Sequence, residues 1–168
     1  MKLIVSALAA LVCAFTASTA YAACDDPAGP GVDWKGCDLT GADLAWADLK
    51  GADLTGANLT DAKLHNANLT NANLTNANLT DAGLIEADLT DANLTNANLT
   101  DAIAWHDHGM LKHTALPNAN LTNANLSGVE LREADLSGAD LTGANLTDAK
   151  LYDANLTNAN LSRADLTS

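Results

Sequence analysis

Basic residues are scarce in this chain of 168 residues, which has eight Lys and Arg against 21 Asp and Glu and a net charge of −13. A surface with this balance repels the phosphates of nucleic acids and the headgroups of anionic lipids. The composition therefore excludes ordinary nucleic-acid binding and favours a soluble, acidic protein.

Long apolar runs are also scarce, and the one that stands out is Leu3–Phe15. This run follows the positively charged Lys2, precedes the small-x-small triplet Ala20–Ala22, and is too short to span a bilayer. These features predict an export signal over residues 1–22 and a mature chain in the periplasm or outside the cell. The signal holds one basic residue and no acidic residue, so the mature chain carries a net charge of −14. No second apolar run follows, so we expect no membrane span.

Cysteine is rare, and Cys13 leaves with the signal, so that only Cys24 and Cys37 remain. An even count in an exported chain predicts one disulfide. Two alternatives stay open: Cys37 is a small buried thiol in a slot that Ala usually fills, or Cys24 carries a lipid anchor. The residues before Cys24 lack the aliphatic residue that lipoprotein processing prefers, which favours the disulfide.

Recognisable catalytic groupings are missing as well. We find no Ser-His-Asp or Cys-His arrangement and no pair of carboxylates in a cleft. The sequence therefore predicts a protein that is not an enzyme.

The abundant feature is a repeat of five residues. Leucine recurs at this interval from Leu39 to Leu99 and from Leu111 to Leu166, and a small residue, nearly always Ala, stands two positions before it. This period fits neither an α-helix nor a plain strand. It fits a coil whose sides are one repeat long, with corners at Asn, Asp or Gly and with Leu and Ala inside. Stacked coils would pair backbone to backbone at about 4.8 Å.

The tandem A(D/N)LxX units resemble the pentapeptide-repeat family over most of the chain. The resemblance implies an all-β fold, a right-handed quadrilateral parallel β-helix with four repeats per coil. We expect residues 23–37 to form an N-terminal cap, with Trp34 in leucine register, and residues 38–168 to form the helix. The last coil has no covering segment, and both this bare edge and the resemblance predict a homodimer through the C-terminal coil.

The repeat slips once, because Leu99 and Leu111 are twelve residues apart, one repeat plus seven. If Ala102–His108 loops out, Leu111 stacks over Leu84. We favour this loop near 102–108 because it leaves a single irregular side and no gap in the core.

A rival register keeps "AIAWH" as a poor repeat with Ala104 inside, and makes Asp107–His108 a two-residue bulge. The repeats after the bulge would then move to the next side of the coil.

In the favoured register, chemical variety gathers on the side that contains Leu44, Leu64 and Leu84. With its loop, this side holds all four His, all three Glu and the one Tyr of the mature chain, whereas the other sides repeat Thr, Asn and Asp. Such a concentration predicts a binding surface for an unknown protein or envelope component. The open alternative is drift around an inserted loop, with charge pairs that aid solubility. The candidate binding residues are Trp46, His65, Glu86, Trp105, His113, Arg132 and Tyr152.

The histidines also suggest a metal site. Glu86 and His113 would occupy the same outward position on adjacent coils, and His106 and His108 would face one way in an extended segment. Imidazoles with a carboxylate suit zinc or copper. The alternative is a solvated loop with a Glu86–His113 pair.

Two other functions remain open beside a non-enzymatic binding or scaffold protein. Thr55, Thr75 and Thr95 would stack in line, and such ladders could bind ice or a crystal surface. The family resemblance implies a second function, since some members are acidic rods that resemble duplex DNA and engage gyrase. The export signal and the leucine-rich core make gyrase binding the least compatible.

Overall fold

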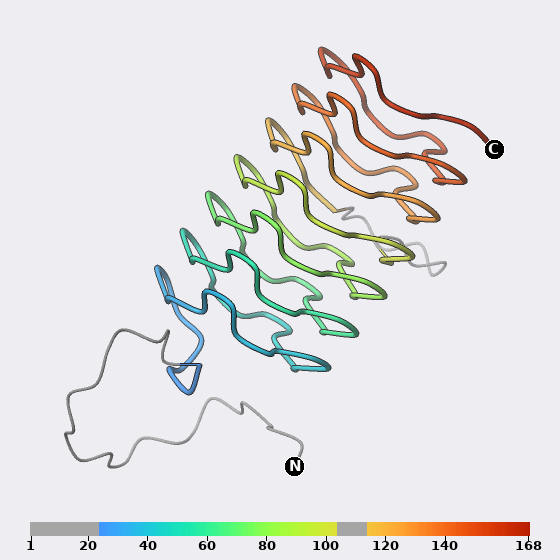
Figure 1. The fold of residues 1–168 in the computed structure, drawn as a ribbon. Coiled ribbons are helices and arrows are strands. Elements are labelled where there is room, and N and C mark those ends of the chain that lie inside the picture. Colours follow the sequence, from blue (N-terminus) through green and yellow to red (C-terminus); the bar gives the residue numbers. More distant parts are fainter. Residues whose placement is uncertain (1–23, 104–113) are drawn as a thin grey trace, which may run out of the picture.

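The computed structural model describes residues 24–103 and 114–168, so the predicted signal at 1–22 lies outside the described residues. These two ranges contain no helix and no strand longer than one residue, and the backbone pairs through isolated parallel bridges, one per repeat. Before the slip, each bridge joins residues 20 apart, such as Asp43 with Lys63 and Lys63 with Gly83. Four repeats therefore complete one coil, and the coils stack into a rod (Figure 1). The predicted β-helix is confirmed.

The core consists of the Leu of each repeat and the Ala two residues before it. Leu54 and Ala52, for example, are at most 1% exposed. The residues on either side of each Leu point outward, because side chains alternate along an extended backbone. A buried Leu contributes roughly 1.5–3 kcal/mol, so the four of one coil supply most of the stabilisation of that coil.

The corners lie two residues after each Leu, where the backbone takes positive φ values of 55–70°. Gly, Asn or Asp holds most of these positions, because these residues tolerate the left-handed conformation best. The corner N–H donates to the next coil, as Asp61 does to the Thr80 carbonyl at 3.0 Å. Corners at Asn, Asp and Gly were predicted from sequence, and this is confirmed. In the described residues the exceptions are Trp46, Glu86, Glu133 and Arg163.

Stacked repeats form four columns, which we number and define by their inward residues as the bridges align them. Column 1 contains Trp34, Leu54, Leu74, Leu94, Leu121, Leu141 and Leu161. Column 2 contains Leu39, Leu59, Leu79, Leu99, Leu126, Leu146 and Leu166. Column 3 contains Leu44, Leu64, Leu84, Leu131 and Leu151. Column 4 contains Leu49, Leu69, Leu89, Leu116, Leu136 and Leu156.

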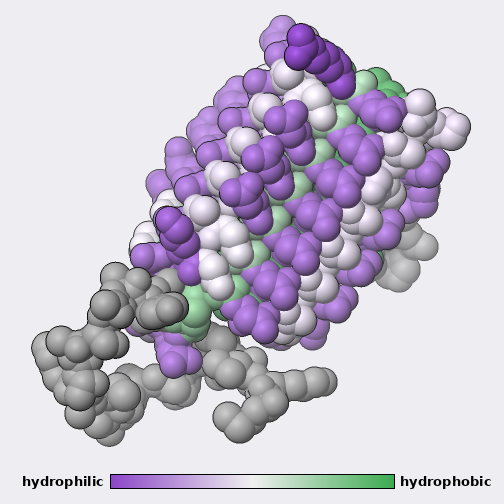
Figure 2. Space-filling view, viewed as in Figure 1, coloured by the Kyte–Doolittle hydropathy of each residue, from purple (hydrophilic) through white to green (hydrophobic). Residues whose placement is uncertain are grey.

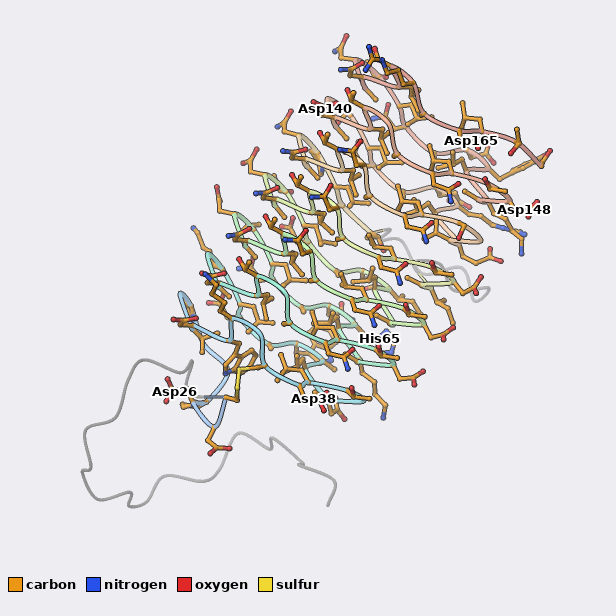
Figure 3. The ribbon with its side chains drawn as sticks, viewed as in Figure 1. Asp26, Asp38, His65, Asp140, Asp148 and Asp165 are labelled. Atoms are coloured by element: carbon orange, nitrogen blue, oxygen red, sulfur yellow. A yellow bond between two sulfur atoms is a disulfide. The ribbon has the colours of Figure 1, made fainter. Side chains whose placement is uncertain are left out.

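The helix begins earlier than the sequence suggested. Asp33 already bridges Asp53, so the repeat starts inside the expected cap rather than at residue 38. Trp34 stands in leucine register and is 1% exposed, as predicted. The predicted Cys24–Cys37 disulfide is present, with a Cα–Cα distance of 5.5 Å, and Figure 3 shows it at the N-terminal end of the rod. Cys37 also fills the slot that Ala usually holds, so it is both buried and bridged.

The two ends of the rod differ in exposure. In the first coil Trp34, Leu44 and Leu49 are at most 2% exposed, whereas in the last coil Leu166 is 56% exposed. The other core residues of the last coil, Leu151, Leu156 and Leu161, are half-buried.

The register across the slip corrects the favoured prediction. Ala102 is fully buried and Ile103 bridges both Gly83 and Glu130, so these residues continue the helix and are not part of a loop. Ala115 bridges Asp88, and these two residues are 27 apart instead of the usual 20. The seven extra residues therefore lie between Ile103 and Thr114. The rival register was right to keep the repeat at Ala102 and wrong to predict a two-residue bulge.

This register nevertheless leaves one continuous irregular side, as predicted. Glu130 and Lys150 follow Ile103 in column 3, so the later repeats stay on that side. Ile103 bridges Gly83, the position that the favoured prediction gave to Met110, while Leu111 itself lies outside the described residues. The Glu86–His113 stacking, which needed that register, loses its basis.

Candidate binding surface

Column 3 presents three parallel rows of outward residues. The bridge row, one residue before each Leu, contains Asp43, Lys63, Gly83, Ile103, Glu130 and Lys150. The outer row, one residue after each Leu, contains Ala45, His65, Ile85, Arg132 and Tyr152. The corner row, one residue further on, contains Trp46, Asn66, Glu86, Glu133 and Asp153.

The described part of the chain brings five of the predicted binding residues into column 3, where Trp46, His65, Glu86, Arg132 and Tyr152 all lie. The other predicted residues, Trp105, His106, His108 and His113, lie outside the described residues.

Exposed large apolar side chains concentrate on this column. In the described residues four large hydrophobic side chains are exposed, and three of them, Trp46, Ile103 and Tyr152, belong to column 3. Trp46 and Tyr152 are each 76% exposed and lie five coils apart, a separation of roughly 24 Å along the rod. Two aromatic side chains at the ends of one strip are typical of a contact surface, because Trp and Tyr dominate the energetics of interfaces.

The backbone of Trp46 adds a second unusual feature. Its φ is 64°, in the left-handed region that costs a residue other than Gly, Asn or Asp roughly 1–2 kcal/mol. Glu86 and Glu133 share this feature, so three of the four unusual corners in the described residues lie in the corner row of column 3. Strain that persists in one row is typical of functional positions.

The basic residues of column 3 are paired with acids. Lys63 Nζ lies 3.9 Å from an Asp43 oxygen, and Glu130 binds both Arg132, at 3.3 Å, and Lys150. Exposed pairs of this kind contribute at most about 1 kcal/mol each, so their main effect is to fix where each charge stands. Glu130 was not among the predicted binding residues, although the sequence already placed it on this side, and its two ion pairs identify it as the centre of this cluster.

His65 lies across Gly83 on the next coil. A Cβ at Gly83 would overlap the imidazole ring, which explains why this bridge position holds Gly. The Nδ1 atom of His65 is buried and has no hydrogen-bond partner among residues 24–103 and 114–168. The ring therefore packs over the backbone of Gly83 on the third coil of column 3.

Thr114 closes the helix on the far side of the slip. It is fully buried in a slot that Ala usually fills, and its hydroxyl donates to the Leu84 carbonyl at 2.7 Å. This bond satisfies a buried polar group and fixes the chain where the regular repeat resumes. No sequence signal marks this role, because Thr is otherwise a common outward residue of the repeat.

In the regular columns, neighbouring Asn and Thr side chains form ladders of hydrogen bonds with one another. In column 2 the Thr80 hydroxyl donates to Asn78 Oδ1 at 2.7 Å and accepts from Asn98 Nδ2 at 2.8 Å. A hydroxyl has a single proton, and here that proton is used inside the ladder. This pattern repeats at Thr60 and at Thr75 and weakens the hypothesis of ice binding through free hydroxyls. Figure 2 shows one face of the rod as parallel rows of hydrophilic and intermediate residues along its axis.

Where Asp replaces Asn in these ladders, the same hydrogen bonds lower the pKa of its carboxyl group. The Thr40 hydroxyl and N–H lower the pKa of Asp38, and the Thr142 hydroxyl and N–H lower that of Asp140. The Thr55 hydroxyl likewise lowers the pKa of Asp53, although partial burial opposes the shift.

In residues 24–103 and 114–168, no group of three or more His, Cys, Asp or Glu is arranged to hold a metal ion. Of the predicted zinc or copper ligands, Glu86 alone is described, in the corner row of column 3. Nor does the described part of the chain contain a helix long and apolar enough to cross a membrane.

Comparison with known proteins agrees with this architecture. A family model described as pentapeptide repeats matches in eight copies over residues 30–56, 37–76, 57–96, 77–104, 111–143 and 144–168. The chain belongs to the pentapeptide-repeat family. Among curated proteins no significant match was found.

Solved structures of similar proteins include other members of this family. HetL from the cyanobacterium Nostoc, involved in the regulation of heterocyst differentiation, is 33% identical; the match covers 81% of this chain and 70% of HetL, with a TM-score of 0.41. A thylakoid-lumen member from Arabidopsis thaliana is 35% identical, with 72% and 69% coverage and a TM-score of 0.40. QnrB1, a plasmid-mediated fluoroquinolone resistance protein, is 21% identical, with 82% and 76% coverage and a TM-score of 0.52, and this likeness shows the fold alone.

Proposed function

We propose that this pentapeptide-repeat protein is a non-enzymatic binding or scaffold protein that holds its partner along column 3. The observation that carries the proposal is the concentration of exposed Trp46, Ile103 and Tyr152 on one column of a rod whose other columns are Asn and Thr ladders. Those ladders satisfy their own hydrogen bonds, so the side chains available to recognise a partner belong to column 3. The rigid backbone holds them at fixed separations, which reduces the entropy lost on binding.

We propose that the protein acts outside the cytoplasm. The export signal predicted over residues 1–22 supports this location, as does the Cys24–Cys37 disulfide, because disulfides persist in oxidising compartments. A lipid on Cys24 is not compatible with that bond, so we favour a free protein over an anchored one.

The finer description of the assembly is also a proposal. We infer right-handed coils of quadrilateral section, which four repeats per coil and family membership support. We further propose that two copies can meet end to end at the last coil, where Leu166 is 56% exposed.

Site-specific photo-crosslinking tests the binding surface. A photoreactive phenylalanine analogue replaces Tyr152 in column 3 in one variant, and Thr157 in column 4 of the same coil in the other. Each variant is expressed with its signal in the native envelope and irradiated. We expect a discrete crosslinked adduct from position 152 and none from position 157.

The result that contradicts the proposal is equal crosslinking at both positions, or none at position 152. Mass spectrometry of the adduct identifies the captured molecule, so a binding surface is recognised whatever the identity of the partner.

A further inference from the structure

We infer that charged residues of the last coil select one two-fold axis for the contact between two copies, and that this axis passes through the corner between columns 2 and 3. The inference rests on the end-to-end contact and the four-sided section proposed above, and it names the residues by which one copy recognises the other. All of these residues lie between Ala149 and Ser168, within the range that the structure describes.

The end of the rod is a spiral ramp with a single step. The last four repeats pass columns 3, 4, 1 and 2 in turn, at Leu151, Leu156, Leu161 and Leu166, and Figure 1 shows this end in red. The end of column 2 therefore stands one coil, about 4.8 Å, above the start of column 3. Two such ramps fit without a gap when the two-fold axis passes through the step, because the high part of each copy then covers the low part of the other.

This axis sets column 2 of one copy against column 3 of the other, and column 1 against column 4. The 56% exposed Leu166 then meets the half-buried Leu151 of the other copy. Leu161 and Leu156, which are also half-buried, meet in the same way. The leucine core of one rod therefore continues into the other.

The backbone groups at this end are complementary under the same axis. In the described residues, no backbone partner is present for the amides of Leu151, Leu156, Leu161 and Leu166 or for the carbonyls of Ala149, Ala154, Ala159 and Ala164. The facing repeats run antiparallel, and antiparallel strands exchange bonds in pairs. Leu166 N–H donates to the Ala149 carbonyl of the other copy, and Leu151 N–H of that copy donates back to Ala164. Columns 1 and 4 exchange the equivalent pair.

The bridge residues at the centres of these repeats are complementary in charge. Asp165, labelled on the last coil in Figure 3, faces Lys150 of the other copy. Lys150 already binds Glu130 on the coil below, so it stands between two carboxylates, one from each copy. In columns 1 and 4 the facing residues are the neutral Asn160 and Asn155. Symmetry repeats each contact.

The same axis accounts for the strained corner at Arg163. This residue has a φ of 62°, is exposed and forms no ion pair with a described residue. Its corner, between columns 1 and 2, meets the corner between columns 3 and 4 of the other copy, where Asp153 lies. A basic residue therefore meets an acidic one at two corners of the dimer, and this contact explains why a residue other than Gly, Asn or Asp is kept at a left-handed position.

Other two-fold axes lose this complementarity. An axis through the middle of column 2 sets Asp165 against Asp165 of the other copy, and an axis through the middle of column 3 sets Lys150 against Lys150. The second diagonal axis sets Asp165 against Asn160 and leaves a gap one coil deep over half of the end. The charges and the shape of the end therefore select the same axis.

The size of the contact sets its expected strength. It covers one end of a narrow rod, which puts it at the small end of specific interfaces. We expect a reversible dimer whose population rises with concentration through the micromolar range. Because a two-fold contact uses the same surface of both copies, association stops at the dimer.

Charge-reversal variants of the full-length chain provide the first test. Arg163→Glu, Asp153→Arg and an equimolar mixture of the two are compared with the wild type. The control is Asp81→Arg, which makes the same reversal at an exposed left-handed corner of column 2 far from the end. Sedimentation velocity over a concentration series measures the dimer, and thermal midpoints establish that each variant is folded.

Each single reversal should weaken self-association at least about tenfold, because symmetry places two like-charge contacts in every dimer. The mixture should recover the dimer, because both corner contacts of the mixed dimer join an acidic side chain to a basic one. The Asp81→Arg control should associate as the wild type does.

A cysteine variant tests the position of the axis directly. The axis leaves the last coil at the corner between columns 4 and 1, so Asn158 of each copy faces Asn158 of the other. Asn158→Cys should therefore form a disulfide between two copies under mild oxidation, since its Cα atoms come within the distance that a disulfide spans. Asn118→Cys, at the same corner of an earlier coil, should not. Non-reducing electrophoresis measures both.

The inference would be overturned by a protein that stays monomeric at all concentrations, by a dimer indifferent to both reversals, or by a mixture no stronger than its components. A dimer that resists the reversals but is lost in Leu166→Asp keeps the proposed end-to-end contact and removes this axis. Binding along column 3 is judged separately by photo-crosslinking. Adducts of twice the chain mass report the dimer, whereas an adduct of another mass at position 152 reports a partner of column 3.

Discussion

A left-handed corner tolerates Gly, Asn and Asp best, and Trp46 departs from this rule while leaving most of its side chain in water. Both features are unfavourable for folding. The simplest physical account is that this residue is retained for what it touches when a partner is bound.

Trp46→Gly should therefore raise stability and weaken binding. Relief of the left-handed backbone strain is expected to add about 1 kcal/mol to the free energy of unfolding. The same change should weaken the crosslinked adduct at position 152. Chemical denaturation measures the first effect and the yield of crosslinked adduct the second.

A matched control is Asn76→Gly at a corner of column 1, where the gain should be smaller because Asn tolerates this conformation. A Trp46→Gly variant that loses stability would show that the indole supports the fold and that its strained corner does not mark a binding role.

The bonds to Asp53 predict a dependence of stability on pH. Its pKa is lowered in the folded protein, chiefly by the Thr55 hydroxyl, so its contribution is present above the unfolded pKa of about 3.9 and is lost as pH falls through the folded pKa. Asn accepts the same bonds at equivalent positions without titrating. As pH falls from about 5 to about 2, the thermal midpoint of the wild type should therefore decrease relative to that of Asp53→Asn.

Comparing the two proteins at each pH cancels the general loss of charge repulsion in acid. A midpoint difference that stays constant over this range would show that the Thr55 bonds do not couple to ionisation.

Ladders of side-chain hydrogen bonds on the regular columns connect successive coils. Asn78 donates to Asn58 Oδ1 at 3.3 Å and to Thr60 Oγ1 at 2.8 Å, and it accepts from Asn98 at 3.2 Å. These bonds link three successive coils of column 2, in addition to the backbone bridges.

Asn78→Ala should cost about 1.5–4.5 kcal/mol more than Asn120→Ala, because Asn78 makes three bonds between coils and each contributes roughly 0.5–1.5 kcal/mol net. Asn120 occupies the same position in column 1, where among the described residues it accepts from Thr122 alone and makes no side-chain bond to another coil. Denaturant midpoints of the two variants provide the measurement. Equal losses would mean that backbone pairing and the leucine core suffice to join the coils.

The fold was predictable because the five-residue period leaves a single arrangement that buries Leu and Ala together, and Trp34 and Cys37 obey the same period. The side on which the later repeats lie was predicted correctly, but sequence spacing alone could not show which residues continue the helix at the slip. Ala102 and Ile103 remain in it, since their backbone groups pair with the coils below and above. Backbone pairing operates without a large side chain, so a repeat can stay in the helix without its leucine.

The placement of five candidate surface residues on one side was also predictable from the sequence. Trp46, His65, Glu86, Arg132 and Tyr152 were assigned to one side from spacing alone, and the bridges place them there. The roles of Gly83 and Glu130 required three dimensions, because their significance lies in contacts with neighbouring coils rather than in their residue types.

The whole molecule is asymmetric along its axis. The first coil is stapled by the disulfide and closed by Trp34, whereas the core residues of the last coil are half-buried or exposed. In a solenoid each coil is stabilised by its neighbours, so an end opens independently of the centre unless it is held. The N-terminal end should therefore be the more protected one in the oxidised protein.

Hydrogen exchange in the presence and absence of the disulfide tests this asymmetry. The bond closes a loop over a sequence separation of 13 residues, which corresponds to roughly 3 kcal/mol in the chain-entropy model. A Cys24→Ser/Cys37→Ala variant removes the bond while placing in the core the residue that the repeat usually has there, so packing is largely kept. In the oxidised wild type the Leu39 and Leu44 amides, which donate to Asn58 and Lys63, should exchange more slowly than those of Asn155 and Asn160.

In the variant we expect exchange at Leu39 and Leu44 to rise toward that of the last coil, while the central Leu79 amide is unchanged. An increase at Leu79 as large as at Leu39 would show that the bond stabilises the rod as one cooperative unit. Unchanged exchange at Leu39 would show that Trp34 alone closes the end, because the leucine amides then stay protected without the covalent constraint.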